Sequence, residues 1–100
     1  MLQYLDFGQY EANAQRFERW RSYRSRWQYH DRAVEVVREL GIGAPEEVLE
    51  IGPYGAQLVQ GSHVMDLPDG DWNHDGRVRY RHDARILPWP VPDGFYRLVV

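Results

Sequence analysis

The sequence predicts a small domain of the α/β class, in which a helical amino-terminal part precedes a short parallel sheet. From Phe17 to Leu40 the apolar and aromatic positions repeat with a helical period. After Pro45 that period is replaced by short apolar segments, each of which ends in a turn. Strands that are separated by crossovers are typical of a parallel sheet. We therefore divide the chain into a helical cap over residues 1–44 and a sheet part over residues 45–100.

The helical part is predicted from residues spaced three and four apart, which therefore share one helix face. These residues are Trp20, Tyr23, Trp27, His30, Val34 and Val37. Asp31 can cap a second helix, so residues 17–40 form either one helix or two helices joined end to end. Gly41, Gly43 and Pro45 follow directly and end the helix.

Four short segments are predicted as strands, at residues 47–51, 62–67, 77–81 and 95–100. The connection between the first two is so short that a helix within it is limited to a turn or two. The second connection is rich in helix breakers and is predicted as a plain loop. Residues 87–94 hold three prolines and are predicted to be irregular.

The composition is that of an ordinary globular protein and excludes several classes. The chain has 100 residues, 43% of them hydrophobic, with a net charge of −3 and no cysteine. Without cysteine there are no disulfides, thiolate metal sites or cysteine nucleophiles. No window has the apolar length of a membrane span, and residues 1–10 do not resemble a secretory signal, so we expect a cytoplasmic protein. The charge gives no general reason to expect nucleic-acid binding.

Glycines and carboxylates follow the predicted strands. Gly52 and Gly55 come after the first strand, where a nucleotide-type ligand needs backbone without a Cβ in the way. Asp66 ends the second strand, and a carboxylate there can accept two hydrogen bonds from a ribose diol. Asp83, followed by Ala84, ends the third. Because α/β sheets bind ligands beyond the carboxyl ends of their strands, this arrangement predicts a pocket for a ribose and a base.

At these residues the sequence resembles the class I S-adenosylmethionine-dependent methyltransferases, and within them the type 11 group. The resemblance covers residues 31–100. It is carried by four motifs in order, namely VLEIGPYG at 48–55, VMDL at 64–67, the Asp-Ala pair at 83–84 with LPWP at 87–90, and PDGFYRLVV at 92–100.

The resemblance implies a Rossmann-like partial sheet of about four strands in the order 3-2-1-4, which is the amino-terminal half of a cofactor-binding domain. It implies S-adenosyl-L-methionine as the cofactor, no metal, and a methyl acceptor that the sequence does not identify. The roles that it implies are as follows: Glu50, Gly52, Tyr54 and Gly55 face the methionine part of the cofactor, Asp66 binds the ribose hydroxyls, Leu67 lies against the adenine, and Asp83 with Ala84 meets the adenine amine and ring edge.

Two departures from the family pattern stand out. Tyr54 replaces the second glycine of the first motif, and Arg97 replaces an aspartate in the fourth strand. The family's sheet also has seven strands, so the chain is interpreted as half of a catalytic domain whose catalytic residues are unknown. The alternative is a non-catalytic, dimeric methyltransferase-like module, paired through residues 95–100 or through the amino-terminal helix.

Three further patterns suggest other functions. Residues 71–76 match the first half of a calcium loop, which makes a calcium-stabilised binding module a weaker alternative, although His82 stands where a bidentate acid is needed. The front helix carries arginines among aromatic residues, a pattern that can serve nucleic acid but is better explained as a solvated face. In the family the front helices often form a lid, so Tyr23, Trp27 or Tyr29 can touch the methionine end or the acceptor.

Overall fold

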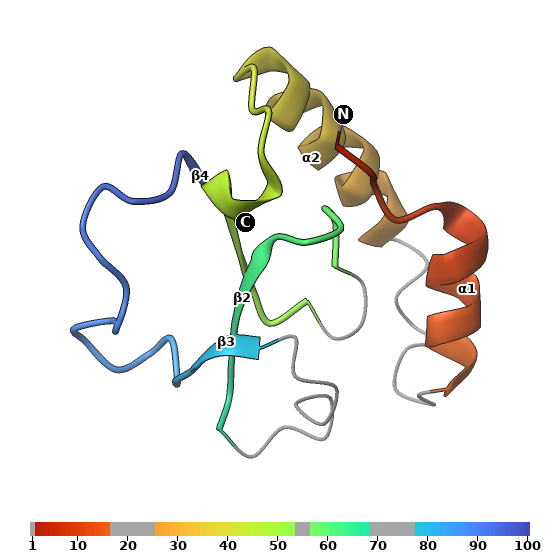
Figure 1. Cartoon of the computed structure of the whole chain (residues 1–100). Helices are drawn as coiled ribbons and strands as arrows, with labels where there is room; N and C mark the ends of the chain where they lie inside the picture. Colours follow the sequence, from red (N-terminus) through yellow and green to blue (C-terminus); the bar gives the residue numbers. More distant parts are fainter. Residues whose placement is uncertain (1, 17–25, 54–56, 69–77) are drawn as a thin grey trace.

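A four-stranded parallel sheet with helices on one side forms the body of the molecule (Figure 1). The computed structural model describes residues 2–16, 26–53, 57–68 and 78–100. The elements are α1 (Phe7–Arg16), α2 (Arg26–Glu39), the 3-10 turn η2 (Pro45–Glu47), β1 (Val48–Ile51), β2 (His63–Asp66), β3 (Val78–Arg81) and β4 (Leu98–Val99).

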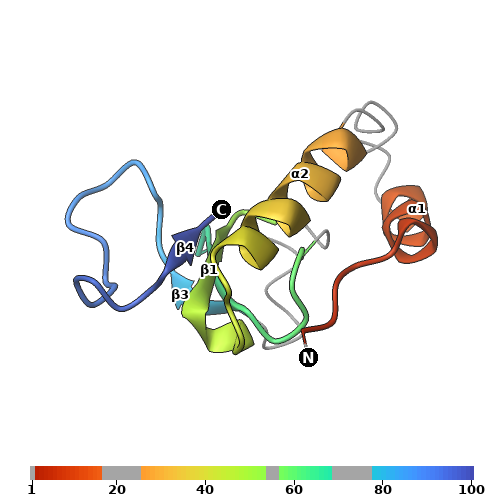
Figure 2. The same cartoon turned by 90° about the horizontal axis from the view of Figure 1, so that it is seen from above.

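The strand order is β3-β2-β1-β4, and β1 pairs in parallel with both β2 and β4. The predicted parallel sheet and its order are thus confirmed. In Figure 2 the sheet lies between α2 and the irregular segment that leads from β3 to β4. No helix in the four described ranges is long and apolar enough to cross a membrane.

Helix α2 packs on the sheet through Val34 and Val37, the last two residues of the predicted stripe. Val34 and Val37 are buried and join Val48 in the hydrophobic core. The helix ends at Glu39, just before Gly41, as the sequence predicts. Gly41 has φ +65°, and the amide of Ile42 donates to the carbonyl of Val37 at 3.3 Å. Residues 17–25, on which the choice between one helix and two depends, lie outside the described residues.

Alternation along the strands divides the side chains between two faces. Glu50 is in register with Val64, which places both on the α2 side together with Val48 and Asp66. Leu49 pairs with His63, and Ile51 with Met65, on the opposite face. Val48 of this face forms the core together with α2, Ile42, and Leu58 and Val59 of the first crossover. No helix lies in the described part of that crossover, residues 57–62.

The fourth strand is shorter than predicted, because β4 covers only Leu98–Val99 instead of residues 95–100. Phe95 and Tyr96 leave the strand direction and pack against His63 of β2. Arg97 donates hydrogen bonds to the carbonyls of Leu40 and Gly41, and its amide donates to the carbonyl of Glu47 at 2.9 Å. Arg97 therefore joins the end of α2 to the start of β1.

The sequence pattern did not predict α1 or the segment before it. The amide of Gln9 donates to the Asp6 carboxylate at 2.8 Å, and the amide of Asp6 donates to the Gln9 side chain at 3.2 Å. This is the reciprocal arrangement of a capping box, and it starts α1. Upstream, Tyr4 forms an antiparallel bridge with Val59. We call residues 3–5 the strap.

Replacing Gly41 with alanine should lower the free energy of unfolding by about 1–2 kcal/mol, because a Cβ is strained at a left-handed φ of +65°. Gly43→Ala is the matched control, since Gly43 lies outside the left-handed region and no atom lies within 4 Å of an added Cβ. Urea unfolding of both variants measures the difference. Equal losses in the two variants would contradict this account of the helix end.

Candidate functional site

The glycine turn after β1 and Asp66 of β2 lie side by side at the carboxyl edge of the sheet. The amide of Gly52 donates to the carbonyl of Met65 at 2.9 Å, one residue before Asp66. Gly52 has φ +57°, a conformation that favours glycine. The amide of His82 in turn donates to the carbonyl of Asp66 at 2.8 Å, so the residues that follow β3 reach the same edge. The predicted meeting of the three strand ends is therefore present.

A cavity of about 300 Å³ opens between this edge and the helices. Its walls come from α1, α2, the end of β1, the first crossover and the residue after β4: Tyr10, Tyr29, His30, Ala33, Glu50, Ile51, Gly52, Pro53, Leu58 and Val100. Burial lowers the pKa of His30, although the Asp31 carboxylate 3.8 Å away acts in the opposite direction. His30 is therefore neutral at pH 7, and the walls are mainly apolar and aromatic. Such a cavity has the size and character of a small-molecule site.

Glu50 is the buried acidic group of this cavity, with 3% of its surface exposed. Its Oε1 accepts the amide of Leu58 at 2.5 Å, and its Oε2 accepts the amide of Val59 at 3.1 Å and the hydroxyl of Ser62. Burial raises the pKa of Glu50, and these three donors partly oppose that rise. The carboxylate thus ties the first crossover to β1. It borders the cavity, but the chain itself occupies both of its oxygens.

Asp66 lies at the end of β2 with 5% of its surface exposed. Its Oδ1 accepts the amide of Leu67 at 2.8 Å, which fixes the carboxylate at the point where the chain leaves the sheet. Leu67 itself is exposed. The carboxylate is therefore held in place beside an exposed leucine, and its Oδ2 is buried.

Asp83 and Ala84 have partners within the chain. The guanidinium of Arg85 binds both oxygens of the Asp83 carboxylate, at 2.7 Å for the closest pair, and lowers its pKa to about 2. The carbonyl of Ala84 accepts the indole N–H of Trp89 at 2.8 Å. An adenine amine at Asp83 would therefore share the carboxylate with Arg85.

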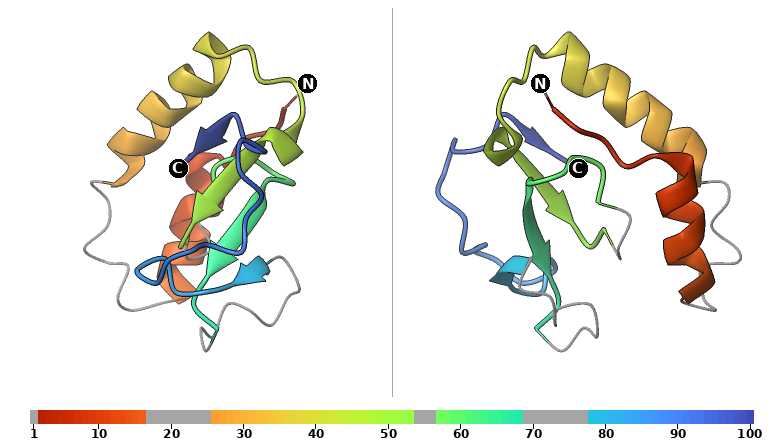
Figure 3. Two further views of the ribbon diagram at one scale, coloured as in Figure 1. Left: turned by 90° about the vertical axis from the view of Figure 1, so that its left-hand side faces the viewer. Right: turned by 45° about the vertical axis from the view of Figure 1, so that its right-hand side comes forward.

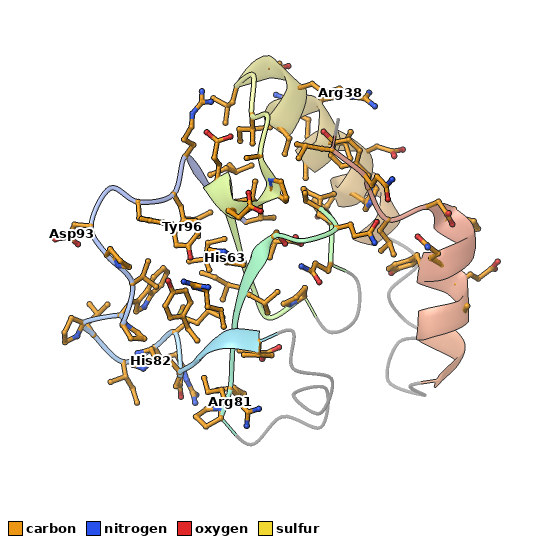
Figure 4. The ribbon with its side chains drawn as sticks, in the orientation of Figure 1. Arg38, His63, Arg81, His82, Asp93 and Tyr96 are labelled. Carbon is orange, nitrogen blue, oxygen red and sulfur yellow. The ribbon has the colours of Figure 1, made fainter. Side chains whose placement is uncertain are left out.

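An aromatic cluster on the other face of the sheet was not predicted from the sequence. Figure 4 shows Tyr96 beside His63. The Tyr96 hydroxyl lies 2.5 Å from His63 Nδ1 and 3.0 Å from the Tyr80 hydroxyl, and Phe95 stacks on the His63 ring. Burial and the Tyr80 hydroxyl raise the pKa of Tyr96. The alternation around Tyr80 was the one sequence signal for this cluster, which covers the face that carries no helix in the described residues.

Several predicted residues lie outside the described part of the chain. They are Tyr54 and Gly55 of the glycine turn, the calcium-like loop at 71–76, and Tyr23 of the front helix. Tyr29 is described and borders the cavity, with most of its side chain exposed. Among the residues that the structure describes, no three His, Cys, Asp or Glu side chains are grouped closely enough to hold a metal ion.

Comparisons of this chain with protein-family models, with curated proteins and with solved structures gave no match. The chemistry of the site therefore rests on its own residues. A left-handed glycine turn and the apolar cavity beside it can hold a ligand with an apolar body, whereas Asp66 on the neighbouring strand is not among the residues that line this cavity.

Glu50→Gln should lower the free energy of unfolding by about 1–3 kcal/mol. The N–H₂ group of glutamine cannot accept a hydrogen bond, so one of the buried donors that bind Glu50 loses its acceptor. The difference in free energy of unfolding between the wild type and Glu50→Gln should be largest below pH 4.5, the ordinary pKa of a glutamate side chain. A raised pKa in the folded state means that wild-type stability is lost as the pH rises through that pKa, whereas glutamine does not titrate.

Urea unfolding between pH 4 and pH 7 measures this dependence, with the exposed Glu46→Gln as the control. If the two variants behaved alike at every pH, Glu50 would not hold the first crossover.

Proposed function

We propose that this chain is the cofactor-binding half of a class I S-adenosylmethionine-dependent methyltransferase. The observation that supports this best is the contact between the Gly52 turn and the end of β2 that carries Asp66, at the carboxyl edge of two central parallel strands. Ligands of open α/β sheets bind at that edge. The strand order β3-β2-β1-β4 is the one that the sequence resemblance implies.

In this proposal the two carboxylates of the site have different tasks. Asp66 accepts the ribose hydroxyls, and Leu67 covers one face of the adenine. Glu50 shapes the cavity for the methionine part through Leu58 instead of binding that part directly. Tyr10 and Tyr29 are the aromatic walls for the sulfonium, which a ring face attracts.

The proposed reaction is direct methyl transfer. The acceptor's nucleophilic atom forms a bond to the methyl carbon while the carbon–sulfur bond breaks, which leaves S-adenosylhomocysteine, and the acceptor loses a proton. The protein's contribution is to hold the two reactants in line. Residues 1–44 would cap the cofactor, residues 45–100 would hold it, and the acceptor is unidentified.

Isothermal titration calorimetry with S-adenosylhomocysteine should show binding, and Asp66→Asn should weaken it about tenfold or more, because charge-assisted bonds to the diol are lost. The matched control is Asp93→Asn, which alters an exposed aspartate of the segment before β4 and should leave the affinity unchanged. Thermal melts establish that each variant is folded. Absence of heat from the folded wild-type chain at millimolar ligand would refute the proposal.

A second candidate, a non-catalytic module that pairs with another copy, draws support from the surface at β4. Val99, Val100 and Phe95 are each about half exposed, at 47%, 45% and 52%. Because β4 stands at the end of the strand order, its outer side can pair with a further strand. Sedimentation equilibrium distinguishes the candidates: a dimer that shows no heat with S-adenosylhomocysteine favours this module.

A further inference from the structure

Another cavity, of about 460 Å³, lies in the segment that leads from β3 to β4. All of its lining residues fall within residues 87–99, and none of them lines the cavity between the sheet and the helices. Figure 2 shows this segment on the side of the sheet opposite α2, and the left-hand view of Figure 3 looks onto it as it crosses the strands. The volume lies in the range of small-molecule sites.

Three aromatic side chains line this cavity, namely Trp89, Phe95 and Tyr96. The ring centres of Phe95 and Tyr96 lie 4.9 Å apart and the ring planes differ by 73°, so the two rings form a corner. Trp89 and Tyr96 are half-buried, and Phe95 has 52% of its surface exposed. The faces of aromatic rings carry partial negative charge. Walls of this kind therefore attract cations as well as apolar groups.

Contacts within the chain hold these three rings in place. The indole N–H of Trp89 donates to the carbonyl of Ala84 at 2.8 Å. The Tyr96 hydroxyl lies 2.5 Å from His63 Nδ1, and the ring of Phe95 stacks on the His63 ring with centres 6.4 Å apart. The polar atoms of Trp89 and Tyr96 thus have partners outside the cavity. Because the rings are ordered before a ligand enters, binding costs less side-chain entropy.

Asp93 is the charged residue of this cavity. Among the described residues that line it, no other carries a charge, and Figure 4 shows Asp93 at the outer turn of the segment. The two arginines of the segment bind other groups, because Arg85 pairs with Asp83 and Arg97 binds the carbonyl groups at the end of α2. Arg79 of β3 lies near the aromatic cluster but does not line the cavity. The negative charge at the rim therefore favours a cation and repels an anion.

We propose that this cavity binds a small organic ammonium ion. The positive centre lies against the rings of Trp89, Phe95 and Tyr96, the alkyl groups fill the apolar space, and Asp93 balances the charge from the rim. Alkylated ammonium ions suit such walls because they bring few N–H groups that must be desolvated. Since Asp93 repels a phosphate, the site takes a free ammonium compound in preference to a phosphocholine group. The site is independent of the proposed function, because the two cavities share no lining residue.

Titration of the full chain with choline, followed in ¹⁵N–¹H correlation spectra, tests the site. The matched probe is the neutral alcohol in which a carbon atom replaces the choline nitrogen, so that the shape is kept and the charge is lost. Choline should shift the Trp89 indole N–H and the amides of Phe95 and Tyr96, with an affinity about fivefold or more above that of the alcohol. Equal affinities, or no shifts with choline in the millimolar range, would overturn the proposal.

Phe95→Leu should weaken choline binding about two- to fivefold, because it removes one ring and keeps an apolar side chain. Its affinity for the neutral alcohol should stay that of the wild type. Phe7→Leu is the matched control, since Phe7 is exposed to a similar extent, 45%, and lies in α1 outside this cavity. Equal weakening for both probes would show that Phe95 only shapes the cavity, and the proposal would be wrong. If Phe95→Leu does not fold in thermal melts, the comparison of the two probes with the wild type decides.

Phosphocholine and Asp93→Asn test the charge at the rim. Phosphocholine should bind more weakly than choline, and Asp93→Asn should weaken choline binding by up to about fivefold. Both effects should shrink at high salt, because Asp93 is exposed and its field is screened. Phosphocholine that binds the wild type as tightly as choline would overturn the assignment of the cavity to a free ammonium compound.

Discussion

The buried carboxylate of Glu50 holds the first crossover against β1. Parallel strands need a crossover, and crossovers of this kind usually contain a helix that covers the sheet. Here the described part of the crossover has no helix, and the chain returns to β2 after the amides of Leu58 and Val59 bind Glu50. These bonds satisfy backbone donors in the core that would otherwise be buried without an acceptor. The same turn of chain buries Leu58 and Val59 and presents a backbone edge to the strap.

The charged side chains of the site differ in the groups that they bind. The Asp83 carboxylate binds the guanidinium of Arg85, and the Glu50 carboxylate binds amides of the first crossover, so both have partners within the chain. Asp66 lies where the glycine turn meets the second strand, which is the position at which a ribose diol is expected. The departure of Arg97 from the family pattern also has a structural reason, because its guanidinium binds the carbonyl groups at the end of α2. In the proposed function, Asp66 is the carboxylate among these three that a ligand would contact.

The sequence predicted the sheet because its signals are local. The apolar runs, the prolines and Gly41 each act within a few residues, and the structure confirms the strands and the end of α2. The role of Glu50 could not be read in this way, since its partners lie eight to twelve residues further along the chain. The strap was missed for the same reason, as Tyr4 meets Val59 across half of the molecule's sequence. A local signal for α1 did exist in Asp6 and Gln9. The shortening of β4 follows from the packing of Phe95 and Tyr96 on His63, which no periodicity encodes.

A ¹⁵N–¹H correlation spectrum titrated with S-adenosylhomocysteine decides whether the ends of β1 and β2 jointly hold a nucleoside. If they do, the largest shifts should fall on the amides of Gly52, Leu67 and His82 at the carboxyl edge, and these shifts should saturate together with one affinity. Shifts confined to the aromatic cluster on the opposite face, or no shifts at saturating ligand, would contradict joint binding at this edge.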